Sequence, residues 1–356
     1  MKTTRSFKKG LLLIALCLTS LMLTSCDASD VTNIFSNKKE YSTTLFAMDT
    51  YMTLTAYGKN AQEAVTAATK EITYLEDIFS TNIDTSEIAQ VNANGGGDVS
   101  EDTAFLIQKS IDYYNETYGT YDISVYPLVY EWGFTTQDYK VPTENRIEEL
   151  LPLIGSDKLH LSYHDDGSAT VSFDKKGMMI DLGTIAKGYA SQKVADIFKE
   201  YDIESGLINL GGNVQLVGSK TDGTNWNVAI QKPDKDAEDS DYVGILSTSD
   251  CAVTTAGGYE RYFEEDGITY RHIFDPSTGR PTESTLKSVS IVTKSGIDAD
   301  GYDTALFVMD LDGAISFWRE HKDLFDVILI AEDDTIYISE GIADSFTTDY
   351  TVEVIK

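Results

Sequence analysis

The sequence contains few cysteines, few histidines and few basic residues, and these shortages exclude several classes of protein. Its 356 residues include 3 Cys, 4 His and 28 Lys or Arg against 58 Asp or Glu, which gives a formal net charge of −30. A surface this acidic repels the phosphates of DNA and RNA, so we expect no nucleic-acid partner. An anionic ligand would need a local positive centre or a metal ion.

The chain also lacks long apolar runs, with one exception near its start. Residues 11–23 are apolar, follow a basic stretch and are too few for a typical membrane-spanning helix. They end in Leu23-Thr24-Ser25-Cys26, which resembles a bacterial lipoprotein signal. We expect residues 1–25 to be a signal peptide, Cys26 to carry the lipid and residues 26–40 to form a lipidated tether. An uncleaved anchor helix is the alternative, and both readings place the rest outside the cytoplasm, attached to the bacterial cell membrane.

Only one cysteine would remain in the mature domain. Cys251 lies in an apolar stretch, so we expect it to be a core residue rather than a nucleophile. An intramolecular disulfide is therefore excluded, and the fold must depend on its core. The chain is 42% hydrophobic, which is enough to bury one.

Hydrophobic periodicity predicts a mixture of helices and strands between residues 41 and 356. Extended segments are expected at 41–57, 178–181, 207–217, 226–231, 242–248, 268–274 and 287–293, with a final hairpin at 325–339. Helices are expected at 60–79, from Ser86, and at 100–118, 143–151, 184–201, 300–310 and 313–321. The motifs described below are spread from Met48 to Thr304. This spread favours one α+β domain over residues 41–356, with a mixed or antiparallel sheet, flanking helices and a cofactor cleft.

Two segments have the chemistry of a metal and phosphate site. Asp181-Leu182-Gly183-Thr184 leads from a predicted strand into a predicted helix, and Lys187 follows it. The free N–H groups at a helix start favour phosphate. Asp300, Asp303 and Thr304 are spaced to share one helix face, and their oxygens suit Mg²⁺. The alternatives are ordinary helix-capping acids and a surface lysine.

His272 is the histidine best placed to act as an acid or base. It sits between a predicted strand and the turn Asp275-Pro276-Ser277-Thr278-Gly279, whereas the other three histidines lie among polar residues. A side chain at such a position can be held at a cleft, where a histidine can act as an acid or a base. Glycine-rich turns at 209–213 and 254–259 would let the backbone approach a ligand closely.

Taken together, these segments resemble the ApbE family of FAD:protein FMN transferases. The matching segments are 47–50, 86–88, 122–129 with 132–134, 181–190, 209–213, 257–263, 272–279 and 300–304. The resemblance covers about residues 44–350, nearly the whole mature chain.

The resemblance implies Mg²⁺-dependent cleavage of FAD, covalent transfer of FMN to a Ser or Thr hydroxyl of an acceptor protein, and release of AMP. His272 matches the catalytic histidine. The implied FAD contacts are Met48, Ser124, Val125, Tyr126, Asp181, Lys187 and Phe274. The implied Mg²⁺ ligands are Thr184, Asp300, Asp303 and Thr304, with Thr184 offering either its hydroxyl or its backbone carbonyl. The chain contains no Ser/Thr-Gly-Ala-Ser/Thr acceptor segment, so we expect the acceptor to be another protein.

Three positions depart from the family pattern. Tyr126 stands where members commonly have glycine, Asn82 where many have an aromatic residue, and Ala256-Gly257-Gly258 where Ser-Gly-Asp/Asn is usual. Asn82 keeps open an FAD pyrophosphatase that yields FMN and AMP. A non-catalytic flavin-binding lipoprotein and a general extracytoplasmic binding module are further alternatives, but neither needs the Mg²⁺ ligand set.

Overall fold

A large, mainly antiparallel sheet forms the centre of the molecule. The computed structural model describes residues 39–238 and 240–356. In this part of the chain, nine strands pair in the order β1-β2-β6-β7-β10-β15-β16-β17-β19, and only the β17–β19 pair is parallel. The strands are β1 (Glu40–Ala47), β2 (Thr50–Tyr57), β6 (Ser205–Leu210), β7 (Asn213–Val217), β10 (Ala252–Gly257), β15 (Leu286–Thr293), β16 (Asp326–Ala331), β17 (Ile336–Ser339) and β19 (Val352–Ile355).

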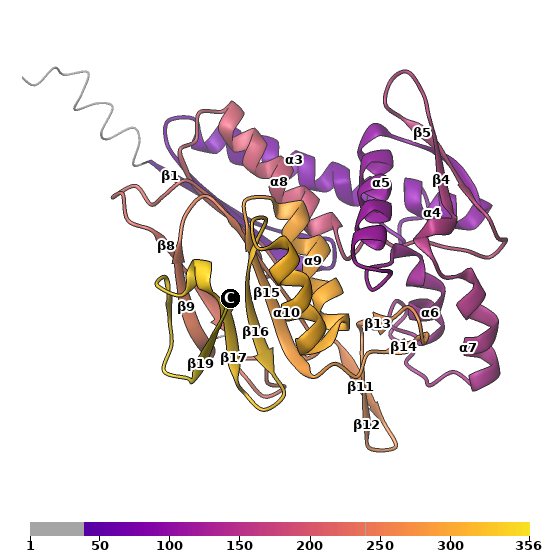
Figure 1. Ribbon diagram of the computed structural model, residues 1–356. Coiled ribbons are helices and arrows are strands. Elements are labelled where there is room, and N and C mark those ends of the chain that lie inside the picture. The colour runs from indigo at the N-terminus through magenta and orange to yellow at the C-terminus, as the bar shows by residue number, and fades with distance from the viewer. Residues whose placement is uncertain (1–38, 239) are drawn as a thin grey trace, which may run out of the picture.

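Four helices cover one face of this sheet, as Figure 1 shows. They are α3 (Ala61–Phe79), α8 (Ala186–Glu200), α9 (Gly296–Val308) and α10 (Asp310–His321). The apolar stripe of α3 is buried throughout, which confirms the periodicity seen in the sequence. A second core lies between the large sheet and a small sheet of β8 (Trp226–Gln231), β9 (Tyr242–Thr248) and β18 (Phe346–Thr347). Cys251 is buried in that core, and burial raises the pKa of its thiol, so it is a core residue as expected.

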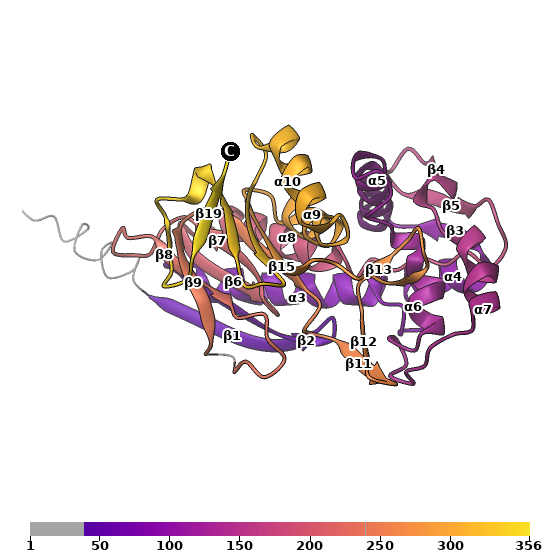
Figure 2. The same cartoon turned by 60° about the horizontal axis from the view of Figure 1, so that its bottom comes forward.

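The remaining elements form a smaller lobe on the side of the sheet (Figure 1). It contains α4 (Glu87–Asn94), α5 (Glu101–Glu116), α6 (Tyr126–Glu131), α7 (Glu144–Leu150) and a sheet of β3 (Gly96–Val99), β5 (Ala169–Phe173) and β4 (Leu159–Tyr163). Two short hairpins connect it to the large sheet: β11 (Tyr262–Glu265) with β12 (Ile268–Arg271), and β13 (Phe274–Asp275) with β14 (Arg280–Pro281). Figure 2 shows the β11–β12 hairpin projecting from the body of the molecule.

Helices α8 and α9 cross at an unusually short distance because glycines face each other. A Cβ on Gly188 would lie 2.4 Å from the carbonyl oxygen of Gly296 and 2.5 Å from Cβ of Asp300. Any side chain larger than hydrogen would push the helices apart. This crossing sets the position of Asp300 against the start of α8.

Several local predictions are wrong. Residues 178–181 form no strand: the backbone of Ile180 bonds to the side chain of Asn92 in both directions, and the amide of Asp181 donates to Ile123. The following helix begins at Ala186, not Thr184, because residues 183–185 form a turn.

Other boundaries also differ from the sequence expectations. Helix α9 begins at Gly296, where Ser295 caps the amide of Asp298, so the Asp300 segment lies in the second turn rather than at the helix start. The segments 207–217 and 268–274 are each divided into two strands. Finally, 41–57 is a hairpin that turns at Met48 and Asp49, both with positive φ.

No helix in the described ranges is both long enough and apolar enough to span a membrane. The predicted signal peptide, Cys26 and nearly all of the tether lie outside the residues that the structure describes.

Candidate active site

A cleft of about 820 Å³ opens where the sheet, α8, α9 and the smaller lobe meet. Its walls come from eight separated parts of the chain, including the β1–β2 turn, the end of α3 and the base of the β11–β12 hairpin. Most of the residues predicted from the sequence line it: Met48, Val125, Asp181, Thr184, Lys187, His272, Phe274, Asp300, Asp303 and Thr304. The fold therefore brings these residues into one site.

Asp300 and Asp303 form a buried pair of acids on α9. Their relative exposures are 5% and 4%. The amide of Gly188 donates to Oδ2 of Asp300 at 2.7 Å, and the amide of Thr304 donates to Oδ1 of Asp303 at 2.5 Å. Burial raises the pKa of both carboxyls, and the nearby Asp300 raises that of Asp303 further. Lys187 opposes both shifts but does not cancel them. The acid pair is therefore short of positive charge.

Unpaired polar atoms surround this acid pair. The side chain of Asn213 lies next to Asp300, and that of Thr254 lies next to Asp303. Both side chains are buried, and within the described residues their polar atoms have no well-formed hydrogen bond. Buried polar groups are normally satisfied, so orphaned atoms beside two carboxylates indicate a place where a ligand or ion completes the bonding. The sequence analysis assigned no role to either side chain, although both lie in the glycine-rich turns that it noted.

Thr184 lies across from the acids, in the turn that precedes α8. Its hydroxyl donates to the hydroxyl of Tyr121 at 3.2 Å. Tyr121 is itself fully buried and also contacts Ser110. This bond uses only the hydroxyl proton, so both the hydroxyl oxygen and the backbone carbonyl of Thr184 keep lone pairs for a cation. Tyr121 was not singled out from the sequence, where nothing marks it apart from other aromatics.

These residues fit a magnesium ion better than a transition metal. In the part of the chain that the structure describes, no group of three or more His, Cys, Asp or Glu side chains could hold a metal. The available donors are two carboxylates, hydroxyls and a carbonyl. Mg²⁺ commonly uses only one or two carboxylates and fills its remaining positions with water and substrate phosphates.

Lys187 and Asp181 stand beside the metal candidates. Lys187 is in the first turn of α8, and its ammonium lies 3.5 Å from the carbonyl oxygen of Gly183. The carboxylate of Asp181 accepts a bond from the amide of Gly183 at 3.0 Å. Burial raises the pKa of Asp181, while Arg261 and Lys187 lower it. The positive centre that an anionic ligand needs is therefore present.

His272 is held in one tautomer by the hairpin beside it. Its backbone amide donates to the carbonyl oxygen of Arg261 at 3.0 Å, and its Nδ1 lies 3.1 Å from the same oxygen. A carbonyl can only accept, so Nδ1 carries the proton and Nε2 is left as the acceptor. Burial in the cleft lowers the pKa of His272 to about 4, and the positive charges of Arg261 and Lys187 add to this effect. A neutral imidazole with a free Nε2 can take a proton from a substrate hydroxyl.

The predicted flavin contacts divide into two groups. Met48 is held in its turn by its amide, which donates to Glu76 at 2.7 Å, and Phe274 packs in an aromatic cluster with Trp132 and Phe134. Both line the cleft, as does Val125.

Ser124 and Tyr126 do not line the cleft. The hydroxyl of Ser124 donates to Asp122 at 2.7 Å and accepts from the amide of Gly155 at 2.6 Å, so this side chain holds the loop together. Tyr126 is buried with its ring against Tyr130, and its hydroxyl lies beside Thr81 and Thr135 at the cleft wall.

The pKa of His272 yields a direct test. Because its folded-state pKa lies below the ordinary value, the unfolded chain binds a proton between about pH 6.5 and pH 4 that the folded chain does not, and this group's contribution to stability falls as pH drops through that window. In an NMR titration of the histidine ring protons, the resonance missing from His272→Ala should stay that of a neutral ring through pH 5. A midpoint at or above pH 6.5 would contradict the described environment.

Known proteins are similar to this chain in sequence and in fold. The ApbE family model matches residues 48–329. The FAD:protein FMN transferase of Treponema pallidum is 31% identical over 323 residues, covering 86% of this chain and 88% of the relative. That of Vibrio cholerae is 35% identical over 240 residues, covering 66% of this chain and 70% of the relative.

Solved structures agree with the sequence matches. The ApbE protein of Thermotoga maritima has a TM-score of 0.78 and 29% identity, and the flavin transferase ApbE of Vibrio cholerae has a TM-score of 0.75 and 28% identity. Each match covers 86% of this chain and 99% of the solved chain. With a family model matched over most of its length, a relative aligned over nearly the whole domain and the same α+β fold in solved structures, this chain belongs to the ApbE family.

Proposed function

We propose that this chain is an FAD:protein FMN transferase that uses Mg²⁺. The observation that carries the proposal is one cleft in which a buried acid pair, Lys187 and a neutral His272 converge. The curated relatives carry the name of this activity. In the reaction, a Ser or Thr oxygen of the acceptor protein bonds to the phosphorus of the FMN half of FAD. The pyrophosphate P–O bond breaks, and AMP leaves.

His272 is the base of this reaction. Its Nε2 accepts the proton of the acceptor hydroxyl as the new O–P bond forms, and the proton then passes to solvent. The bond from Nδ1 to the carbonyl of Arg261 keeps the ring in the tautomer that this step requires. The neutral state at physiological pH means that the base is ready without prior loss of a proton.

Asp300, Asp303, Thr304 and Thr184 are the proposed Mg²⁺ ligands. When bound, the ion would neutralise charge on the pyrophosphate oxygens and on the departing AMP. Lys187 supports the same charge from the start of α8, and Asp181 holds the turn that leads into it. The flavin would lie against Met48, Val125 and Phe274 on the cleft wall.

An FAD pyrophosphatase remains the second candidate, because Asn82 lines the cleft. The family resemblance implies an aromatic residue at this position in many members, and a small polar side chain there leaves room for water. Water would then replace the acceptor hydroxyl, and the products would be free FMN and AMP. A non-catalytic flavin carrier is less well supported, since it needs neither the buried acid pair nor a neutral base.

The choice between these activities depends on the fate of the FMN group. Wild-type protein incubated with FAD, Mg²⁺ and an acceptor domain should give a protein band that stays fluorescent after denaturation, with AMP released in equal amount. His272→Ala should lose labelling by at least about a hundredfold, because a placed base contributes roughly 10²- to 10⁴-fold, yet still bind FAD. In-gel flavin fluorescence and AMP quantification measure the two products. Release of AMP and free FMN with every genuine acceptor, and labelling with none, would establish the pyrophosphatase instead.

Replacing one acid tests the metal site. Asp300→Asn keeps the shape of the side chain and an acceptor for the amide of Gly188, but removes the charge. We expect Mg²⁺-dependent turnover to fall by at least about a hundredfold, with a smaller loss of FAD affinity. Asp298→Asn is the matched control, since Asp298 is on the same helix but bonds to Tyr113 outside the cleft. Full Mg²⁺-dependent activity in Asp300→Asn would remove this residue from the metal site.

We also propose that the protein is anchored outside the cytoplasm by lipid on Cys26. The basic, apolar and Cys-terminated leader supports this location. Cys26→Ser should move the protein from the membrane fraction to the soluble fraction without loss of specific activity, because the catalytic cleft begins beyond residue 45. Fractionation before and after a salt wash measures the change. A Cys26→Ser protein that stays with the membranes after the wash would contradict lipidation at this residue.

A further inference from the structure

The β11–β12 hairpin has its base in the cleft and its tip outside. The base is closed by the two bonds that His272 makes to the carbonyl of Arg261. Farther out, Phe263 and Tyr270 stack on each other and pack against Trp132 of the smaller lobe, with ring centroids 5.0 to 6.4 Å apart. The residues at the base are therefore fixed relative to both lobes.

Arg261 differs from every other arginine that the structure describes. Arg146, Arg271 and Arg280 each pair with a carboxylate, and Arg319 donates to the carbonyl of Lys356. Among the described residues, Arg261 has neither an ion pair nor a side-chain hydrogen bond within the protein, although it lines the cleft. Its guanidinium and the ammonium of Lys187 are cleft cations that are both free to meet an anion.

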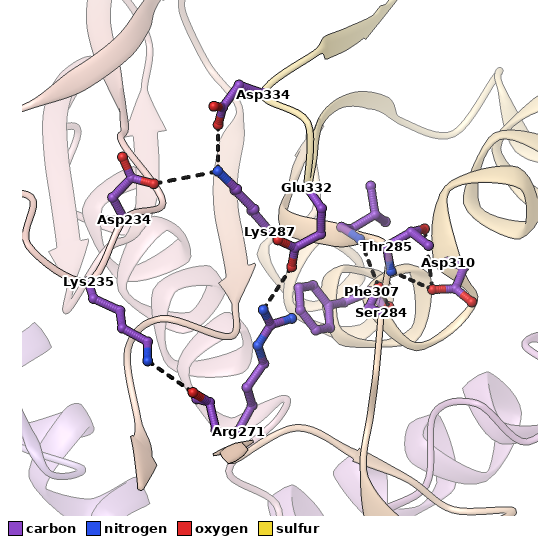
Figure 3. A network of polar contacts seen from close by, with 12 residues as sticks. Asp234, Lys235, Arg271, Ser284, Thr285, Lys287, Phe307, Asp310, Glu332 and Asp334 are labelled. Atoms are coloured by element: carbon purple, nitrogen blue, oxygen red, sulfur yellow. Dashed lines mark hydrogen bonds and ion pairs between the residues drawn. The ribbon is translucent and has the colours of Figure 1, made fainter. Parts of the chain in front are cut away.

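The contrast with Arg271 is clearest because both arginines belong to the same hairpin. Arg271 lies at the end of β12, and its guanidinium bonds to Glu332 at 2.7 Å (Figure 3). The nearby Lys235 is likewise paired, with Glu264. Acidic partners are thus available around this hairpin and are used, yet Arg261 is left without one.

Arg261 lines the cleft and lies close enough to the groups inside it for its charge to act on them. Its positive charge acts on His272 and on the carboxylates of Asp181 and Glu260, and Lys187 acts on the same three groups. Arg261 therefore shares a region with both the base and the lysine at the start of α8. A cation at this place would stand where negative charge develops during transfer of a phosphoryl-linked group.

We propose that the guanidinium of Arg261 binds the phosphate of the FMN half of FAD, the group that His272 helps to transfer. The proposal rests on the proposed transferase function and adds a catalytic residue to it. A planar guanidinium can hold two phosphate oxygens at once, which a lysine cannot do. Arg261 thus supplies charge from the hairpin, and Lys187 supplies it from α8.

Two variants of Arg261 test this role through binding and turnover. Arg261→Gln should lower FAD affinity by about tenfold, the effect of one charge-assisted hydrogen bond, and leave the affinity for riboflavin, which has no phosphate, unchanged. It should also lower kcat for AMP release by about a hundredfold. Arg261→Lys should recover part of both losses, because it restores the positive charge without the paired N–H donors of the guanidinium. Flavin fluorescence titration and AMP quantification provide the measurements.

Arg271→Gln is the control, since it removes an arginine from the same hairpin that is paired away from the cleft. It should keep FAD affinity and kcat within about twofold of wild type. The proposal is overturned if Arg261→Gln behaves like Arg271→Gln, if it weakens FAD and riboflavin equally, or if only the KM for the acceptor protein rises. The comparison of FAD and riboflavin binding tests Arg261 even if wild type transfers no FMN. Failure of the transferase proposal can therefore be distinguished from failure of the proposal for Arg261.

Discussion

Two like charges buried side by side are the constraint on which the rest of this site depends. Asp300 and Asp303 are almost fully buried on one face of α9. In a low-dielectric interior such a pair is costly unless positive charge or hydrogen-bond donors meet it. The surrounding structure supplies these in part, through the amide of Gly188 and the ammonium of Lys187, while the polar side chains of Asn213 and Thr254 lie close by without a well-formed bond. What it does not supply is enough positive charge, and this shortfall is the physical basis for the proposal that a cation binds there.

The close crossing of α8 and α9 makes this arrangement possible. Gly188 and Gly296 let the two backbones approach until the amide of Gly188 reaches the carboxylate of Asp300. His272, the proposed base, comes from a different part of the fold, the inner end of the β11–β12 hairpin, and the proposed flavin contacts come from a third. The site therefore forms only when long-range contacts are complete, and its precision depends on how the two lobes pack.

Much of the fold was accessible from the sequence because its signals are local. The stripe of α3, the helix start at Ser86 and the final hairpin all follow from side-chain period and turn chemistry. Residues 178–181 were wrongly predicted to form a strand because their apolar side chains resemble those of a buried strand. Their backbone is instead hydrogen-bonded by the side chain of Asn92, far away in the chain.

For the site, residue identity predicted which side chains would gather but not how each is used. Ser124 matched the family pattern, yet its hydroxyl supports a loop rather than facing the cleft. Tyr121 and Arg261 were assigned no role of their own from the sequence, although Arg261 lies in the matching segment 257–263. Their roles depend on tertiary structure: a bond to Thr184 in one case, and the absence of any partner among the described residues in the other.

The two ends of the β11–β12 hairpin have different roles. The tautomer of His272 is set at the closed end of β11–β12, while the acidic turn at the far end contacts nothing in the cleft. Residues can thus be inserted into or deleted from that turn without moving Nε2, since the strand pairing absorbs the change before it reaches the base. The length of this turn is consequently independent of the position of the groups in the cleft.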